Sequence, residues 1–195
     1  MENKDLTRRL SASSVGIAGA GGLGSNVAMA LARAGVGHLL IVDFDRVEGS
    51  NLNRQYYFKD QIGEFKVEAI RENIEKAVDG CHVELLNKKL EKGVMHEPFG
   101  EVDVVVEALD SASTKADFIE DILNNLPGKP LVGASGVAGI GGGQRIVLER
   151  FGELYLVQDH EARSSDKDVL LSPKVGLFAH YQANVVLEIL TGGGR

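Results

Sequence analysis

The amino-acid sequence predicts an α/β fold in which a doubly wound, mostly parallel sheet carries an antiparallel extension toward the C-terminus. Three observations support this. Short apolar runs alternate with segments of helical periodicity, a glycine-rich turn follows the first apolar run, and two strand-like runs follow each other late in the chain. Because helices connect most of the strands, we expect those strands to run parallel.

The first half of the chain shows this alternation most clearly. Val15–Ala18 is a short apolar run, and residues 23–34 carry apolar positions at helical spacing up to Gly35, a typical helix stop. His38–Val42 is a second strand of the buried type. Residues 64–78 then predict an amphipathic helix with a charged outer face.

The pattern continues beyond this helix. Further strands are expected at His82–Leu86, Val102–Glu107 and Pro130–Ala134. A helix near Thr114–Leu126 is expected to end before Pro127, since proline cannot continue a helix.

The last quarter of the chain has a different pattern. Residues 144–149 and 153–158, separated by the turn-like Arg150–Gly152, predict an antiparallel hairpin. Residues 159–170 are polar and loop-like, and residues 173–190 predict a final helix that opens on proline.

Size and composition limit the possible functions. A chain of 195 residues with 44% hydrophobic content predicts a single domain spanning 1–195. The net charge of −7 argues against a nucleic-acid partner or an anionic membrane surface. Cys81 is the only cysteine, which excludes an intrachain disulfide and a zinc site of two Cys-x-x-Cys pairs. We therefore expect no zinc and a reducing, cytoplasmic setting. No membrane span is expected either, because no stretch reaches the ~18 uninterrupted apolar residues that a span requires.

The glycine turn predicts a phosphate site in a Rossmann-like fold. Gly19, Gly21 and Gly24 satisfy G-x-G-x-x-G, with Gly22 between them, at the passage from a strand into a helix. Bare backbone and a helix N-terminus both favour phosphate there. Asp43 ends the second strand at the distance typical of a ribose ligand, although a strand-terminal aspartate also caps turns. These features fit NAD and ATP equally well.

The loop after Asp43 favours ATP. Transfer of an adenylyl group builds negative charge on the α-phosphate and on departing pyrophosphate, and arginine, lysine and Mg²⁺ stabilise such charge. Arg54 and Lys66 fit this need. Neutral amides that can bond phosphate oxygens or orient Arg54 are Asn51, Asn53 and Gln55.

A family resemblance follows from these motifs together. GAGGLGSN, DFDRVEGSNLNRQ, GEFKVEAI and a later aspartate strongly resemble the ThiF/MoeB/HesA family, relatives of the ubiquitin-activating enzymes. The resemblance covers roughly residues 13–190 and is closest to the compact ThiF-type sulfur carrier protein adenylyltransferases. The signature D-x-D-x-V-x-x-S-N-L-x-R-Q is far more specific than the glycines alone.

The resemblance implies a role for each matching residue. Arg54 and Lys66 would neutralise the triphosphate, and Asp110 would position Mg²⁺, so these three are the implied catalytic residues. Asp110 is also the implied metal ligand. The implied nucleotide-binding residues are Gly19, Gly21, Gly22, Gly24, Asp43, Ser50, Asn51, Asn53, Arg54, Gln55, Lys66, Asp110 and Ser111.

The resemblance also implies an activity and partners. Such enzymes use ATP and Mg²⁺ to adenylate the C-terminal Gly-Gly carboxylate of a ubiquitin-fold sulfur carrier, here a ThiS-like protein of thiamine thiazole synthesis. They form homodimers. Since residues 158–170 contain no cysteine, the sulfur donor is expected on another protein. Cys81 is expected to be a small buried hydrophobic residue.

The chain departs from the family pattern in two places. Ser111 and Lys115 stand in DSASTK where relatives often have Asn and Arg, which changes the hydrogen bonding available around Asp110. Arg8 and Arg9 lie too close to the glycine turn to match the arginine of the relatives' N-terminal helix. Asp110 could also simply cap the helix that follows.

Other functions fit parts of the same pattern. The superfamily includes ATP-dependent dehydratases of threonylcarbamoyladenosine in tRNA, although an acidic chain disfavours a tRNA substrate. A non-catalytic scaffold for a ubiquitin-fold partner and an NAD-dependent dehydrogenase are further alternatives. Residues 158–170 could clamp the carrier's tail or form solvated surface.

Overall fold

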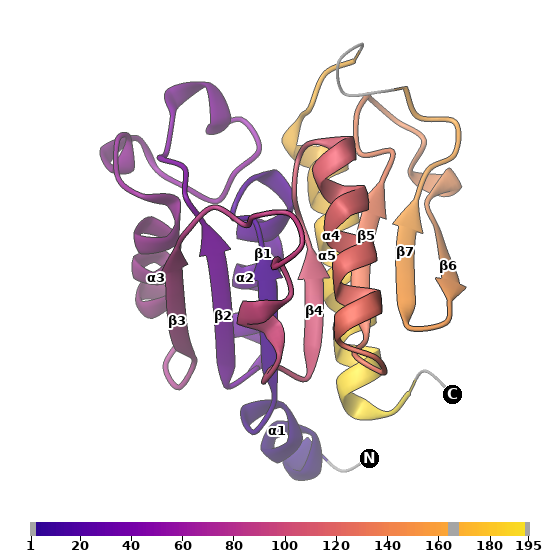
Figure 1. The fold of residues 1–195 in the computed structure, drawn as a ribbon. Helices are drawn as coiled ribbons and strands as arrows, with labels where there is room; N and C mark the ends of the chain where they lie inside the picture. Colours follow the sequence, from indigo (N-terminus) through magenta and orange to yellow (C-terminus); the bar gives the residue numbers. More distant parts are fainter. Residues whose placement is uncertain (1–2, 164–167, 194–195) are drawn as a thin grey trace.

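A computed structural model describes residues 3–163 and 168–193, and within them seven strands form one sheet (Figure 1). The order across the sheet is β3-β2-β1-β4-β5-β7-β6. The strands are β1 (Ser14–Ala18), β2 (His38–Asp43), β3 (His82–Asn87), β4 (Val104–Glu107), β5 (Leu131–Ser135), β6 (Val147–Phe151) and β7 (Leu154–Gln158). Chain order reverses between β1 and β4, as in a doubly wound sheet.

The sheet is parallel except at one edge. β1 pairs in parallel with β2 and β4, and the parallel pairing continues to β3 on one side and through β5 to β7 on the other. Only β6 runs antiparallel, against β7. The predicted fold class and the predicted antiparallel extension are therefore confirmed.

The hairpin differs from its prediction in where its first strand and its turn begin. β6 begins at Val147 rather than at residue 144, because Gly143–Arg145 form a short 3₁₀ helix. The turn also moves: Arg150 and Phe151 belong to the strand, and Gly152, with φ +63°, starts the two-residue connection. Glycine adopts this left-handed conformation without steric cost.

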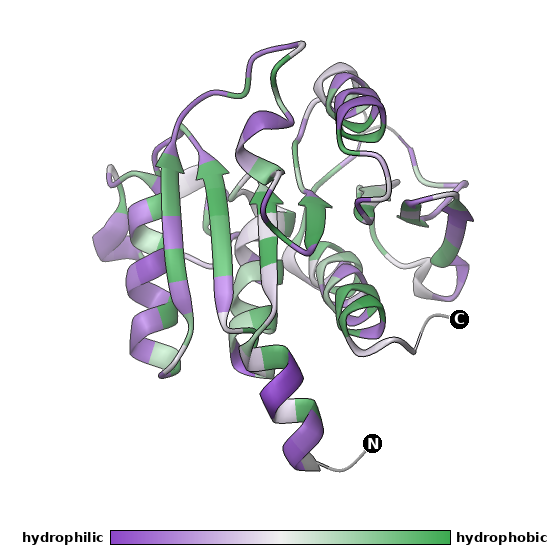
Figure 2. Cartoon of the chain, turned by 60° about the horizontal axis from the view of Figure 1, so that its bottom comes forward, coloured by the Kyte–Doolittle hydropathy of each residue, from purple (hydrophilic) through white to green (hydrophobic). Residues whose placement is uncertain are grey.

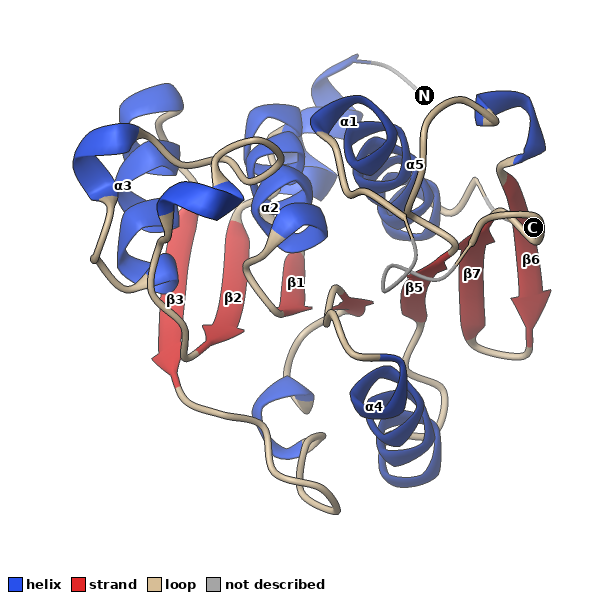
Figure 3. Cartoon of the chain, turned by 90° about the horizontal axis from the view of Figure 1, so that it is seen from above, coloured by secondary structure: helices blue, strands red, loops and turns tan. Residues whose placement is uncertain are grey.

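Helices cover the two faces of the sheet unequally. Seen from above, α2, α3 and α5 lie on one face, whereas α4 lies on the other (Figure 3). The helices are α1 (Asn3–Ser11), α2 (Gly22–Ala34), α3 (Lys66–Ala77), α4 (Ala112–Asn125) and α5 (Ser172–Thr191). None of the helices in the described residues is long and apolar enough to cross a membrane.

Each face of the sheet has its own hydrophobic core. Val27, Ile70 and Phe178 belong to the larger core, under α2, α3 and α5, while Phe99 and Phe118 belong to the smaller core under α4. The central strands are hydrophobic along most of their length, and the helices place polar residues outward (Figure 2). This burial on both faces explains the near-continuous apolar runs in the sequence.

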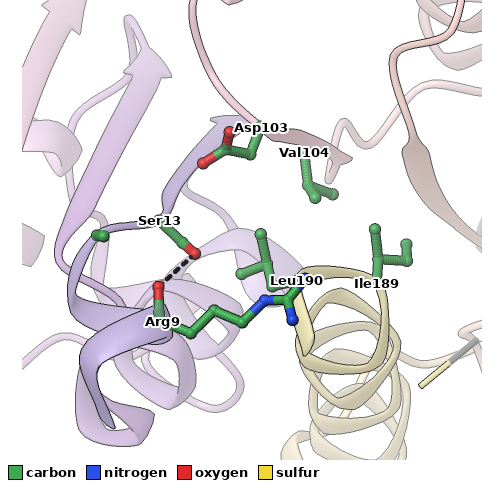
Figure 4. Close-up of a pocket in the computed structure, with 7 residues that line it drawn as sticks. Arg9, Ser13, Asp103, Val104, Ile189 and Leu190 are labelled. Atoms are coloured by element: carbon green, nitrogen blue, oxygen red, sulfur yellow. Dashed lines mark hydrogen bonds between the residues drawn. The ribbon is translucent and has the colours of Figure 1, made fainter. Parts of the chain in front are cut away.

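The N-terminal helix α1 was not predicted. It lies at the end of the sheet where the parallel strands begin (Figure 1), so Arg8 and Arg9 are remote from the carboxyl ends of those strands. Arg9 lines an open cavity of about 400 Å³ beside Leu190 of α5 and Asp103 (Figure 4). The Ser13 hydroxyl donates to the Arg9 carbonyl at 2.8 Å there.

Candidate nucleotide site at the carboxyl edge of the sheet

The glycine turn between β1 and α2 is tightly packed at two positions. Gly19 has φ +96°, and a Cβ there would lie 2.7 Å from the carbonyl oxygen of Ala108. A Cβ on Gly24 would lie 1.8 Å from the carbonyl oxygen of Gly19. No side chain fits either place, so these two glycines bring α2, the turn and the end of β4 together.

Gly21 has more open surroundings, whereas a Cβ on Gly22 would lie 3.2 Å from Val175 Cγ1. Gly21 is the N-cap of α2 and makes no side-chain capping bond. A Cβ added to Gly21 would meet only the Gln55 amide nitrogen, at 3.8 Å. Space beside Gly21 together with the exposed amide end of a helix is the environment that a phosphate group requires.

Asp43 holds the glycine turn in place. Its Oδ2 accepts from the Ala20 amide at 2.6 Å, and its Oδ1 accepts from the Asp45 amide at 2.8 Å. The Tyr57 hydroxyl donates to the Ala20 carbonyl at 2.6 Å, so Ala20 is held from both sides. The turn-capping role that the sequence allowed is therefore present, and ribose binding by the remaining lone pairs stays a prediction.

Arg54 is oriented by neighbouring amides. Its Nη1 donates to Asn53 Oδ1 at 2.8 Å, and its Nη2 donates to Asn51 Oδ1 at 3.0 Å. A Cβ on Gly22 would lie 3.6 Å from Arg54 Cγ, which places the arginine side chain beside the glycine turn. Asn51 and Asn53 thus orient Arg54, one of the two roles that the sequence suggested for the amides, whereas Gln55 bonds Asn51 instead.

The amide of Gln55 has an unused oxygen. Its Nε2 donates to Asn51 Oδ1 at 3.2 Å, whereas its Oε1 is buried without a hydrogen-bond partner among the described residues. A buried acceptor without a partner is costly. The Nε2 of the same amide would lie 3.8 Å from a Cβ on Gly21, which places the Gln55 side chain beside the glycine turn.

Two residues that sequence reasoning missed hold this loop together. Glu48 Oε2 accepts from Ser50 Oγ and from Asn51 Nδ2, both at 3.2 Å. Asn26 Nδ2 donates to the carbonyls of Gly22 and Arg54, at 2.7 and 3.0 Å. Both residues lie inside the family motifs quoted from the sequence, and this position is the one signal by which they could have been found.

Lys66 begins α3 and is buried, with 6% of its surface exposed. Its ammonium contacts Asp45 Oδ2 at 2.8 Å, and its amide donates to the Asp45 carbonyl at 2.9 Å. A lysine at this place in an amphipathic helix would ordinarily be solvated. The structure instead pairs it with Asp45, a third residue that sequence reasoning missed.

Asp110 lies three residues beyond the end of β4 and is exposed. Within the described residues its carboxylate has no hydrogen bond or ion pair. The helix-capping alternative is wrong, because the Ser111 hydroxyl caps α4 by accepting from the Thr114 amide at 3.4 Å. Asp110 is therefore available to a ligand.

The loop between β7 and α5 is anchored at its C-terminal end. Asn53 Nδ2 donates to the Leu170 carbonyl at 3.2 Å, and the Ser172 amide donates to the Asn53 carbonyl at 3.1 Å. These bonds connect the end of the loop to the arginine-bearing segment. The expected clamp at 158–170 lies partly outside the described residues, because 164–167 are not described.

A buried ion-pair network starts this loop. Asp159 accepts two hydrogen bonds from Arg145, both at 3.0 Å, and one from Lys174 at 3.1 Å. Lys174 also donates to the Ala138 carbonyl at 2.8 Å. The Arg145 guanidinium, helped by Lys174, holds the pKa of Asp159 well below its usual range.

The structure gathers the predicted residues from three neighbouring strands. The glycine turn follows β1, the loop with Arg54 and Lys66 follows β2, and Asp110 follows β4. All three strands end at the same edge of the sheet. Arg54 donates to neighbouring amides, and Lys66 pairs with Asp45. Asp110 contacts neither Arg54 nor Lys66, so the three charged groups are not paired with one another.

The residues present fit ATP with Mg²⁺ better than a metal held by protein alone. Among residues 3–163 and 168–193, no group of three or more His, Cys, Asp or Glu side chains could hold a metal ion. Mg²⁺ needs no such group, since one carboxylate, substrate phosphates and water suffice. Asp110 offers that carboxylate.

Cys81 is unsuited to nucleophilic chemistry at neutral pH. It is partly buried against the larger core, and burial raises the pKa of its thiol to about 11. At pH 8 about one thiol in a thousand is ionised, against roughly a quarter for an ordinary cysteine.

We expect iodoacetamide to alkylate folded protein at pH 8 on the order of 100-fold more slowly than free cysteine. The rate should rise about tenfold per pH unit toward pH 10, as the thiolate fraction grows. Mass spectrometry of timed samples would measure it. Labelling at the rate of free cysteine would contradict the buried thiol.

The chain is similar in sequence to proteins named as adenylyltransferases and activating enzymes. It is 31% identical over 191 residues to the adenylyltransferase and sulfurtransferase UBA4 of Eremothecium gossypii, a match that covers 94% of this chain and 43% of the relative. It is 35% identical over 112 residues to the molybdopterin-synthase adenylyltransferase of Haemophilus influenzae, covering 57% and 46% of the two chains. The chain thus spans less than half the length of these relatives.

Solved structures share the fold at low sequence identity. The E. coli tRNA N6-threonylcarbamoyladenosine dehydratase TcdA in complex with ATP superposes with a TM-score of 0.86 and 21% identity, over 97% of this chain and 90% of that one. The profile of the ThiF family matches residues 2–195. With a seven-stranded sheet and a glycine turn of the expected form, the chain belongs to the ThiF family.

Proposed function

We propose that the protein is an ATP-dependent adenylyltransferase that activates the C-terminal Gly-Gly carboxylate of a ubiquitin-fold carrier protein. One observation carries this proposal. Asp110, a carboxylate with no partner among residues 3–163 and 168–193, and Arg54, a guanidinium oriented by amides, lie on loops that flank the glycine turn. A dehydrogenase has no need of this pair of charges, whereas transfer of a phosphate-bearing group does.

The residues have distinct tasks in this proposal. The amides at the start of α2, beside Gly21 and Gly22, receive phosphate oxygens, and Asp43 binds the ribose hydroxyls. Arg54 and Lys66 neutralise charge on the triphosphate. Ser50, Asn51, Asn53, Gln55 and Ser111 complete the polar lining.

Asp110 would hold Mg²⁺ together with the phosphates. The ion supplies Lewis-acid stabilisation of charge that develops on phosphate oxygens. The chain's own residues supply orientation, because they hold two anions, the carrier's carboxylate and the triphosphate, within reach of each other.

The step balances without a protein nucleophile. A carboxylate oxygen of the carrier attacks the α-phosphorus of ATP, the bond from that phosphorus to the bridging oxygen of pyrophosphate breaks, and an acyl-adenylate forms. No proton transfer is needed at neutral pH, because both reacting oxygens are anionic. The raised pKa of Cys81 agrees with a reaction that does not use it.

We assign the carrier to the ThiS-like class of thiamine thiazole synthesis, with the sulfur donor on another protein. The absence of a second cysteine in the sequence supports a separate donor. Relatives named as activating enzymes for ubiquitin-like and archaeal modifiers support a ubiquitin-fold partner in general. A homodimer of single-domain, cytoplasmic chains completes the proposal.

Exchange of labelled pyrophosphate into ATP tests the proposal directly. We expect exchange that requires Mg²⁺ and a carrier ending in Gly-Gly, and no exchange when the same carrier lacks its last two residues. Candidates from the ThiS, molybdopterin and ubiquitin-like classes would be compared side by side. If none supports exchange, the protein does not adenylate a carrier.

A second candidate is ATP-dependent activation of modified tRNA. It is favoured by a 32% identical relative, the tRNA threonylcarbamoyladenosine dehydratase 2 of Saccharomyces cerevisiae, whose match covers 63% of this chain and 28% of the relative. The net charge of −7 disfavours it. Filter binding with tRNA separates the two activities, and parallel titrations with ATP and NAD exclude or reveal a dehydrogenase.

A further inference from the structure

Glu107, the last residue of β4, is fully buried at 0% exposure and lies three residues before Asp110. Its carboxylate accepts from Lys115 Nζ through both oxygens, at 2.8 and 2.9 Å. Its Oε1 also accepts from the Leu109 amide at 2.7 Å. A buried carboxylate therefore fixes both the backbone of the turn and the only lysine of α4.

The neighbouring strand of the sheet lies against this carboxylate. A Cβ on Gly133 of β5 would lie 3.5 Å from Glu107 Oε2, an ordinary van der Waals distance, so the carboxylate packs directly against β5. Gln182, from α5, inserts where β4 and β5 stop pairing, and its Nε2 donates to the carbonyls of Glu107 and Val132 at 3.1 and 3.3 Å. The end of β4 is thus held from three directions.

The same turn is joined to the glycine turn. The Ala108 amide donates to the Ala18 carbonyl at 2.9 Å. A Cβ on Gly19 would strike the Ala108 carbonyl, and one on Gly24 would lie 3.3 Å from Ala108 Cβ. The position of Asp110 relative to the proposed phosphate site therefore depends on how the turn from 107 to 111 is held.

We propose that Glu107 and Lys115 are positioning residues for Asp110, and that Glu107 keeps the Lys115 ammonium from neutralising it. Lys115 lies five positions after Asp110 on the first turn of α4, and its charge is bound to Glu107 through two contacts. Asp110 meanwhile has no partner among the described residues. The pair leaves Asp110 with its full negative charge for a cation.

The electrostatics favour this division of charge. Glu107 is enclosed, so loss of its partner would leave a buried, uncompensated charge, whereas exposed Asp110 is solvated by water. The ammonium therefore prefers Glu107. If Glu107 is made neutral, the ammonium is released on the first turn of α4, five positions after Asp110, and we expect it to compete with Mg²⁺ for that carboxylate.

The inference rests on the proposed function, and nucleotide binding tests it without turnover. We would measure binding of α,β-methylene-ATP by calorimetry, with and without Mg²⁺, for Glu107→Gln and for the double variant Glu107→Gln/Lys115→Met. Glu107→Gln should reduce the Mg²⁺-dependent gain in affinity about tenfold. The double variant, which removes the released ammonium, should recover most of that gain.

Asp117→Asn is the matched control. Asp117 lies on the same helix as Lys115, and its carboxylate pairs at 2.6 Å with exposed Lys92 of the segment after β3. Freeing Lys92 should leave the Mg²⁺ response unchanged. If Glu107→Gln does not fold, Glu107→Asp replaces it, since a shorter carboxylate loosens the contact with Lys115 and should produce the same loss in smaller degree.

The outcomes separate this inference from the proposed function. A wild-type protein that gains no affinity from Mg²⁺ would sink the proposed function. A wild-type gain that persists in Glu107→Gln, or a loss that the double variant does not repair, would overturn the role of the pair alone.

Discussion

Asp110→Asn is expected to reduce carrier-dependent pyrophosphate exchange by at least about 100-fold while nucleotide binding without Mg²⁺ stays near wild type. The carboxylate is exposed and has no partner in the described residues, so its loss costs little folding free energy. Asparagine keeps the shape but removes the charge that would hold Mg²⁺. Exchange assays across a range of Mg²⁺ concentrations would measure the effect.

Asp79→Asn provides the comparison for this variant. Asp79 is also exposed and follows α3, at the end of the sheet where the parallel strands begin, so its replacement removes the same charge away from the site. Exchange should remain at the wild-type rate. Equal activity in Asp110→Asn and the wild-type protein would refute the role assigned to Asp110.

Asp159→Asn is expected to lower the free energy of unfolding by about 3 kcal/mol at pH 7. The substitution leaves Lys174, buried at 4% exposure, without its counter-charge and releases Arg145 from two hydrogen bonds. Because this network starts the loop between β7 and α5, activity should fall together with stability. Urea unfolding monitored by circular dichroism would give the difference.

The effect should depend on pH in a defined direction. The folded-state pKa of Asp159 is depressed, so its stabilisation is complete above the unfolded-state pKa of about 4 and is lost as the pH falls toward the folded value. The difference between wild type and Asp159→Asn should therefore be largest at neutral pH and shrink below about pH 4. A difference that grows on acidification would contradict this network, and Asp117→Asn should show no comparable trend.

The sequence alone predicted the secondary structure correctly where the local pattern of residues agrees with the final conformation. Val15–Ala18, the glycine turn and His38–Val42 lie close together along the chain, and each carries the period or the turn residue of its final conformation. The late hairpin was also recognisable, although its first strand begins three residues later than predicted and its turn is shifted. Register depends on the conformation of Gly152 and on the preceding 3₁₀ helix, which alternation alone does not encode.

The remaining features depend on contacts between distant segments. The helix α1 has only Leu6 and Leu10 as inward-facing apolar residues, too few for periodicity to stand out. The partner of Asp159 in α5 is 15 residues away, and Asn53 bonds a carbonyl 117 residues away. No local pattern reports such pairs, because tertiary packing creates them.

The candidate site shows the same limit. The motifs predict Arg54, Lys66 and Asp110 as functional residues, which stays a prediction, and they do not show that Lys66 is buried against Asp45 or that Glu107 takes up the charge of Lys115. Sequence position indicates which charges converge on one edge of a sheet. Only the three-dimensional structure shows which of these charges are already paired and which remain available to a ligand.

The contact between Gly24 and the Gly19 carbonyl has a thermodynamic consequence. Since no atom can be added between them, the start of α2 and the turn before it share one rigid arrangement that is established when the chain folds. Incoming phosphates would meet amides that need no further ordering, so the entropic penalty of association at this turn is small. Replacing either glycine with a larger residue would weaken ligand binding because it distorts the turn, although no contact with the ligand itself is removed.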